Sequence, residues 1–266
     1  MSFSPILPFS GYSGWAFLKR TMANQQTAQQ NTASAKREEA YFRANIGKIN
    51  SAAELVDDRR LLSVALTAFG LEGDLKNKAF IRKVLEDGTL NPASLANRLA
   101  NKQYHQLSAA FGFGDLGVPR NKISDFADQI ISQYNSRSFE TAVGAQNNNF
   151  RIALNAERDL AQLAAKPGTE NLKWFTILGN PPLREAFQTA LGLPSGFAGI
   201  NLDQQLAVIK AKTRAAFGSD TISQFTDPTK VEKLVRTYLV RAEIAGQSQS
   251  SYAGSIALQL LSAGRR

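Results

Sequence analysis

Hydrophobic residues recur at helical spacing along most of the chain from residue 51 onward. In the segment 57–71, Leu62, Leu66 and Phe69 fall three or four residues apart, which places them on one face of a helix. Comparable spacing predicts further helices over 78–85, 123–134, 150–165, 202–217 and 251–261. No stretch alternates apolar and polar residues with the Val, Ile and Thr enrichment of a strand. The pattern therefore predicts an all-α protein.

Several helix boundaries are marked by capping residues. Ser51 and Glu54 have the spacing of a capping box, in which Ser accepts from a backbone amide and Glu reaches back. An Asn or Asp directly before Pro is a strong start signal, because the first side chain caps exposed amides and Pro lacks only an N–H that would be unpaired. Such starts occur at Asn91, Asn180 and Asp227.

The chain contains a candidate internal repeat. Residues 60–71 aligned with 182–193 share five of twelve positions, including the Gly-Leu pair that ends each block. Residues 89–99 resemble 225–235 in the same order. A glycine there permits a left-handed helix cap, and the following Leu can fold back onto the helix. We expect one helical unit used twice by internal duplication; convergence of helix caps is the alternative.

The repeat divides the chain into three expected parts. Residues 1–50 form a polar segment rich in Ala, Gln, Thr and Asn, expected to be either a mobile tail or a solvated helix. Residues 51–145 form the first helical unit. Residues 146–266 form the second, which we expect to pack with the first as one body.

Composition limits the chemistry. The 266 residues include no Cys and one His, which excludes disulfides, iron–sulfur clusters and a cysteine nucleophile. His105 has no nearby nucleophile or metal-ligand partner in the sequence, and we interpret it as structural. The glycines of 112–120 and 192–199 lack the pattern of a phosphate-binding loop. We predict no cofactor, no metal and no enzymatic activity; an enzyme with an unfamiliar site would need a deep pocket.

Two carboxylate pairs have structural explanations. Asp57-Asp58 precedes a helix and two arginines, where capping and compensation of the helix dipole account for it. Glu38-Glu39 follows Lys36-Arg37 in a polar segment, which is typical of a solvated helix face. Neither pair therefore requires acid–base or metal chemistry.

The net charge of +9 raises an alternative function. Lys210, Lys212 and Arg214 form a candidate basic patch, with Lys210 and Arg214 on one helical face as i,i+4 neighbours. Such a patch would attract phosphates weakly and in a salt-dependent way. The sequence has no zinc finger or RNA-reading motif, so a basic nucleic-acid-associated protein is the alternative and not the leading hypothesis.

The sequence offers no apolar run long enough to span a bilayer. Its first twenty residues lack the basic start and uninterrupted apolar stretch of a signal peptide. We expect a cytoplasmic protein, or one that reaches the flagellum through a dedicated apparatus without a cleavable leader.

Three blocks of sequence resemble the bacterial DUF1217 family: DDRRLLSVALTAFGLEGDLKNKAFIRKVLEDG, LANRLANKQYHQLSAAFGF and PPLREAFQTALGLP. Members of this family are often encoded among flagellar genes. The resemblance implies an all-helical fold and a flagellum-associated role, and it supplies no catalytic residues. We therefore expect a non-enzymatic helical protein that binds flagellar protein partners. Its candidate anchors in the N-terminal segment are Trp15, Phe17, Leu18 and Met22, which could instead dock on the chain's own core.

Overall fold

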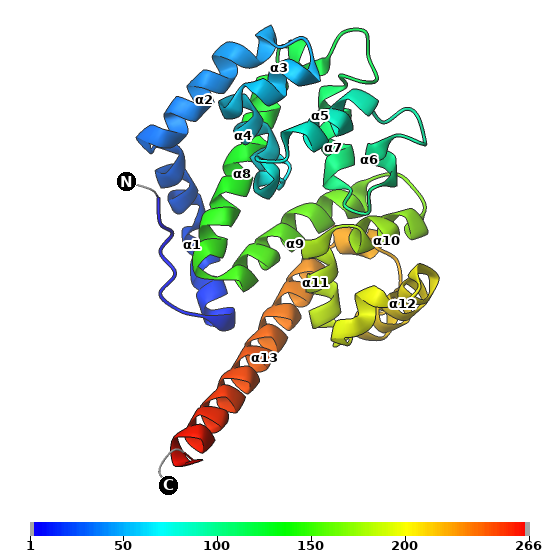
Figure 1. Ribbon diagram of the computed structural model, residues 1–266. Coiled ribbons are helices and arrows are strands. Elements are labelled where there is room, and N and C mark those ends of the chain that lie inside the picture. Colours follow the sequence, from blue (N-terminus) through cyan, green and yellow to red (C-terminus); the bar gives the residue numbers. More distant parts are fainter. Residues whose placement is uncertain (1–2, 264–266) are drawn as a thin grey trace. The chain divides into compact units, whose positions relative to one another are not determined.

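The computed structural model describes the backbone of residues 3–263 and the side chains of residues 3–246 (Figure 1). Over this range all regular secondary structure is helical, which confirms the predicted all-α class. The thirteen α-helices are α1 Gly11–Gln30, α2 Ala33–Asn45, α3 Ala52–Asp57, α4 Arg59–Ala68, α5 Lys78–Asp87, α6 Leu95–Arg98, α7 Gln103–Phe111, α8 Phe126–Gln146, α9 Asn148–Ala165, α10 Glu170–Leu178, α11 Pro181–Ala190, α12 Leu202–Phe217 and α13 Pro228–Ala263. Five short 3₁₀ helices join them: η1 Ile46–Lys48, η2 Glu72–Asp74, η3 Arg120–Lys122, η4 Ser195–Gly199 and η5 Ser223–Thr226.

The chain forms two compact units, and it passes between them more than once. The first unit comprises Met1–Leu7, Leu18–Gln146 and Gly179–Pro181. The second comprises Pro8–Phe17, Asn147–Leu178 and Pro182–Arg266. The N-terminal residues expected to be a tail or a solvated helix contain α1 and α2. The division into parts at residues 50 and 145 stays a prediction.

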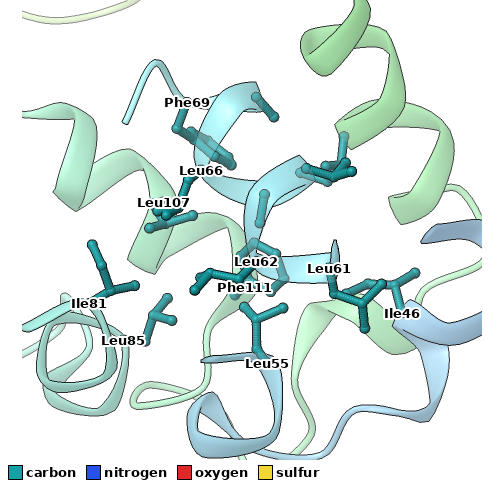
Figure 2. Close-up of a cluster of buried hydrophobic side chains, with 14 of the residues drawn as sticks. Ile46, Leu55, Leu61, Leu62, Leu66, Phe69, Ile81, Leu85, Leu107 and Phe111 are labelled. Atoms are coloured by element: carbon teal, nitrogen blue, oxygen red, sulfur yellow. The ribbon is translucent and has the colours of Figure 1, made fainter. Parts of the chain in front are cut away.

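The core of the first unit is built around α4, which packs against α8, α2 and α3. Its apolar residues meet those of α3, α5 and α7, as Figure 2 shows. Leu62 and Phe111 are fully buried within this cluster. The helical spacing read from the sequence at 57–71 therefore identified the central helix of this unit.

The core of the second unit is a chain of aromatic rings beneath the α9–α13 pair. The ring of Phe187 lies 5.4 Å from that of Trp174 and 5.6 Å from that of Phe225. Phe217 extends the chain at 5.3 Å from Phe225. Edge-to-face contacts of this kind stabilise a core beyond the area that they bury.

Most capping predictions hold. The Ser51 hydroxyl accepts from the Glu54 N–H at 3.2 Å, although the Glu54 carboxylate accepts from Asn50 and not from Ser51. Helix α11 begins at Pro181 and α13 at Pro228, as the Asn-Pro and Asp-Pro pairs predict.

Two boundary predictions were wrong. The Asn91-Pro92 pair forms a turn, in which the Ser94 N–H donates to the Asn91 carbonyl at 2.9 Å, and α6 begins only at Leu95. The side chain of Asn91 caps the Ala93 N–H within that turn and so does not cap a helix. The predicted helix 251–261 is not separate, because α13 runs without a break from Pro228 to Ala263.

The repeated Gly-Leu pairs have matching geometry. Gly70 and Gly192 both adopt left-handed backbone conformations, with φ of 70° and 64°. The Leu71 N–H donates to the carbonyl of Leu66 at 2.8 Å, and the Leu193 N–H donates to the carbonyl of Gln188 at 2.9 Å. Both helices thus end in the predicted left-handed cap, in which the residue after glycine closes the last turn.

Candidate interaction surfaces

The candidate anchors of the N-terminal segment lie mostly against the chain itself. Trp15 is buried, with its ring 6.1 Å from that of Phe150, and Leu18 is fully buried. Phe17 and Met22 are half-buried. A partner would reach Trp15 or Leu18 only if α1 left its place. This packing is what we expect of residues that dock on their own core, and an anchor role for them stays a prediction.

The candidate basic patch is divided between two faces of α12. Lys210 and Arg214 lie one turn apart and both face Asp220, at 3.8 and 3.0 Å. Lys212 is exposed and lies two residues away from each, which puts it on another face of the helix. The hydrogen bond from Arg214 holds the pKa of Asp220 below its usual value. Since Asp220 offsets part of this charge, the patch is a weak phosphate site, and nucleic-acid binding stays a prediction.

An open hollow of about 520 Å³ adjoins Lys210 and Arg214. Its walls mix both charges with small apolar side chains, and Lys210 also donates to the Asn171 carbonyl at 3.2 Å. Neither a nucleophile–base pair nor a uniform charge lines it. The lining residues are Asn171, Asp203, Leu206, Ala207, Lys210, Ala211, Arg214 and Asp220.

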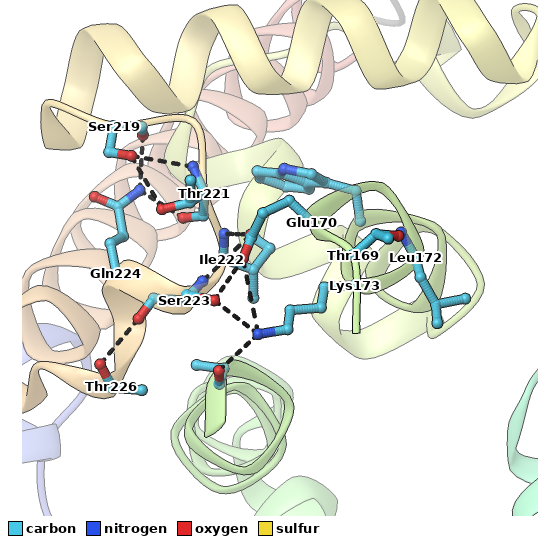
Figure 3. A network of polar contacts seen from close by, with 12 residues as sticks. Thr169, Glu170, Leu172, Lys173, Ser219, Thr221, Ile222, Ser223, Gln224 and Thr226 are labelled. Atoms are coloured by element: carbon cyan, nitrogen blue, oxygen red, sulfur yellow. Dashed lines mark hydrogen bonds and ion pairs between the residues drawn. The ribbon is translucent and has the colours of Figure 1, made fainter. Parts of the chain in front are cut away.

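The second unit also contains a buried lysine in a polar network (Figure 3). Lys173 is 5% exposed, and its ammonium donates to the Ala164 carbonyl at 2.9 Å and to the Ser223 hydroxyl at 2.7 Å. The Glu170 carboxylate lies 3.7 Å from the same ammonium and accepts hydrogen bonds from Ser223 and from the Ile222 N–H. The network joins α9, α10 and η5.

A serine beside a lysine raises the question of nucleophilic catalysis. A lysine that acts as a general base must be neutral and present a lone pair to the hydroxyl. Here Lys173 donates to two acceptors and faces a carboxylate, which favours its protonated form. Burial alone would raise the pKa of Glu170, but hydrogen bonds from Ser223 and Ile222 outweigh it and lower that pKa. The network is therefore a structural tie.

The other candidates for chemistry have structural roles. Asp58 caps α4, since its carboxylate accepts from the N–H groups of Arg60 and Leu61 at 2.9 and 3.0 Å. Glu38 pairs with Arg60 at 3.1 Å, and Glu39 pairs with Arg43 at 2.9 Å.

The histidine and the acidic residues form no metal site. Burial lowers the pKa of His105, with a further lowering by Lys102 that Asp115 opposes. No three acidic or histidine side chains of the described residues gather into a group that could hold a metal ion.

Two adjoining loops of the first unit expose large apolar side chains that the sequence analysis did not single out. Leu90 is 74% exposed, Leu116 40% and Val118 69%. We call these three residues the loop patch. They follow α5 and α7, in segments that the sequence shows only as polar-to-glycine turns.

The loops that carry the loop patch are fixed by the carboxylate of Asp115. It accepts from the Thr89 N–H at 2.7 Å, the Thr89 hydroxyl at 2.7 Å and the Leu90 N–H at 2.9 Å. The loops also approach closely at Gly114, where an added Cβ would lie 2.2 Å from the Glu86 carbonyl oxygen. The loop patch therefore sits on a backbone that is ordered before any partner arrives.

Every helix in the described part of the chain is too short or too polar to cross a bilayer. The protein is similar in structure to a protein from Agrobacterium tumefaciens known from an X-ray crystal structure, with a TM-score of 0.73 and 26% sequence identity. That similarity covers 91% of this chain and 99% of the other. No curated protein matches the chain.

The family resemblance read from the sequence is confirmed by a match over residues 68–231 to the family described as "Protein of unknown function (DUF1217)". This match includes α5 to α12 and the loop patch. Since it covers more than half of the chain, the protein belongs to the DUF1217 family.

Proposed function

We propose that the protein is a non-enzymatic helical interaction protein and that the loop patch is the surface through which it binds a protein partner. The observation that carries the proposal is the exposure of Leu90, Leu116 and Val118 on loops held rigid by Asp115. Single exposed apolar residues are common, but a group of them on adjoining fixed loops favours a contact surface.

The energetics of such a surface are favourable for binding. Fully burying a Leu or Val side chain contributes about 1.5–3 kcal/mol relative to leaving it exposed. Ordering a mobile loop would oppose this gain, and the hydrogen bonds of Asp115 have already ordered these loops. A partner with a complementary apolar surface would therefore bind without the entropy cost of fixing the backbone.

The partner that we propose is a protein of the flagellar assembly or basal body. Family membership supports this proposal, because the family resemblance implies a flagellum-associated role. The absence of cysteine and of a Sec-type leader is compatible with it. The protein would then act in the cytoplasm or at the flagellum.

The test is a pair of variants expressed in a flagellated cell that lacks the native copy. Leu90→Ser with Val118→Ser should abolish swimming and remove the protein from purified basal bodies, while its helical circular dichroism stays unchanged. Leu172→Ser, an exposed apolar residue of the second unit, is the matched control and should swim normally. A double variant that swims and co-purifies like the wild type contradicts the loop patch. Absence of the wild type from every flagellar fraction contradicts the flagellar partner.

We further propose that the repeated blocks arose by internal duplication. The same devices follow one another in both units: a helix ended by Gly-Leu, a 3₁₀ helix, a second helix and a left-handed glycine. They are α4, η2, α5 and Gly88 in the first unit, and α11, η4, α12 and Gly218 in the second. A crystal structure in which residues 59–88 fail to superimpose on 181–218 contradicts a common origin.

A further inference from the structure

Residues 3–7, which we call the N-terminal segment, lie against α1 and α8 of the first unit without forming a helix themselves. The ring of Phe3 is 6.2 Å from that of Phe139 on α8. At the end of α8, the amide of Gln146 donates to the Pro5 carbonyl at 2.7 Å and to the Ser4 hydroxyl at 3.0 Å. Pro5 is buried. The segment is thus held as a peptide ligand would be.

A second amide holds the segment from α1. The buried Gln25 side chain accepts from the Ile6 N–H at 2.8 Å and donates to the Ile6 carbonyl at 3.2 Å. Gln25 also donates to the Thr21 hydroxyl at 2.8 Å, which fixes the direction of the amide. A side-chain amide that pairs with both groups of one residue satisfies them as a neighbouring strand would. Gln25 and Gln146 therefore recognise the main chain and do not depend on the side chain of Ile6.

The geometry requires the N-terminal segment to be extended. Helix α1 begins at Gly11, and Gln25 lies fourteen residues further on, about 21 Å along the helix. The five residues from Ile6 to Gly11 can span at most about 18 Å. The chain must therefore run back along α1 nearly fully stretched, as the trace in Figure 1 shows.

The segment has a natural pivot at Leu7-Pro8. Beyond it, the Phe9 ring lies 6.4 Å from that of Phe17, and the Ser10 carbonyl accepts from the Gly14 N–H at 3.1 Å. Those contacts keep residues 9 and 10 on the start of α1 when residues 3–7 leave. Release costs a few hydrogen bonds and the burial of Phe3 and Pro5, and it unfolds no helix.

We propose that the surface formed by Gln25, Phe139 and Gln146 is an exchange site, which accepts residues 3–7 of a second copy of the protein in place of the chain's own. The occupant is identified by the structure, because a second copy carries the same residues that already fit there. Each copy would lose and regain the same contacts, so that exchange is nearly neutral apart from the cost of association.

The size of that cost sets the conditions for exchange. A segment on a short tether competes at an effective concentration in the mM range. Exchanged pairs therefore need a protein concentration approaching ~1 mM, or an assembly that crowds copies together to the same extent. This inference is independent of the flagellar partner proposed above.

The absence of native cysteine gives a direct test. A Ser4→Cys chain is mixed with a Gln146→Cys chain near 1 mM under mild oxidation, and disulfide-linked heterodimer is measured on a non-reducing gel. We expect about tenfold more heterodimer than from Ser4→Cys mixed with Lys212→Cys, since only the former pair is brought together by the exchange site. The yield should rise with protein concentration.

Two further samples make the outcome decisive. A chain carrying both Ser4→Cys and Gln146→Cys should close an internal disulfide at μM concentration, which shows that the two positions can bond. If it closes while the mixed chains give no more heterodimer than the Lys212→Cys control, the second copy is excluded. If it fails to close, and Ile6→Cys with Gln25→Cys also fails, the segment is not seated and the proposal falls. A synthetic peptide of residues 2–9 that binds where mixed chains do not cross-link would replace the second copy with a partner segment.

Discussion

The carboxylate of Asp115 accepts hydrogen bonds from both the backbone N–H and the hydroxyl of Thr89, each at 2.7 Å. These residues are 26 positions apart, so that one side chain ties the loop after α5 to the loop after α7. We predict that Asp115→Ala lowers the free energy of unfolding by about 1–3 kcal/mol, since buried donors lose their acceptor. Urea unfolding measures the change. Asp57→Ala, which removes an exposed carboxylate, should stay within about 0.5 kcal/mol of the wild type. An equal loss in both variants would refute the tie.

The same carboxylate should make stability depend on pH. Burial alone would raise the pKa of Asp115, but hydrogen bonds from Leu90 and Thr89 outweigh it and lower that pKa. A carboxyl group with a lower pKa in the folded state stabilises the fold above its unfolded pKa of about 3.9, and this contribution is lost as pH falls through the folded value. Unfolding free energies measured between about pH 2.5 and 6 should show a shallower acid slope in Asp115→Asn than in the wild type. Parallel slopes would show that Asp115 does not carry this effect.

The two Gly-Leu caps predict a matched pair of destabilising substitutions. Gly70→Ala and Gly192→Ala place a Cβ on a residue with positive φ, which costs about 1–2 kcal/mol. At Gly192 the added Cβ would also lie 2.1 Å from the Arg241 guanidinium, which must move. Thermal unfolding should show a lower midpoint for both variants. Gly73→Ala is the control, since its Cβ meets nothing within 4 Å and its φ is not positive. A midpoint as low in the control as at the caps would refute the left-handed requirement.

The features that the sequence predicts well are those fixed by neighbouring residues. Gly70 and Gly192 end their helices because glycine alone adopts the left-handed cap without strain, and the residues that close each turn lie within five positions. The helix over 202–217 was predicted with its observed bounds because its caps, Asn201 and Gly218, are also local. Local rules therefore gave the fold class and most of the boundaries.

The features that the sequence does not reveal depend on distant residues. Asn91 has the residue type of a helix cap, yet the amide of Asn97 donates to its carbonyl at 2.7 Å and helps to hold it in a turn. Lys173 resembles an ordinary surface lysine until Ser223, fifty positions later, folds over it. The loop patch is likewise set by Asp115 acting on a loop 25 residues earlier. Contacts at such separations leave no periodic signal in one sequence.

The buried lysine predicts a large effect from a small truncation. Lys173→Ala removes the donor to the Ala164 carbonyl and the cation beside Glu170, so the free energy of unfolding should fall by about 1–3 kcal/mol. Guanidinium unfolding measures the loss. Lys212→Ala, on the exposed face of α12, should change stability by less than about 0.5 kcal/mol. A neutral Lys173→Ala would mean that the network does not hold α9, α10 and η5 together.

One substitution should stabilise the protein. Thr213 is fully buried in α12, and its hydroxyl oxygen has no hydrogen-bond partner. An unpaired buried hydroxyl costs about 1–3 kcal/mol, whereas a valine of nearly the same shape fills the space with a methyl group. Thr213→Val should therefore raise the free energy of unfolding by about 1 kcal/mol and raise the melting temperature.

The matched control for that gain is a threonine whose hydroxyl is paired. Thr176 donates to the Leu172 carbonyl at 2.9 Å within α10. Thr176→Val makes the same chemical change but removes a hydrogen bond, so it should leave stability unchanged or lower it slightly. Because both substitutions replace a helical threonine by valine, helix propensity shifts equally and cancels between them. A gain confined to Thr213→Val therefore measures the burial of the unpaired hydroxyl, and equal shifts in both variants would show that Thr213 finds a partner in solution.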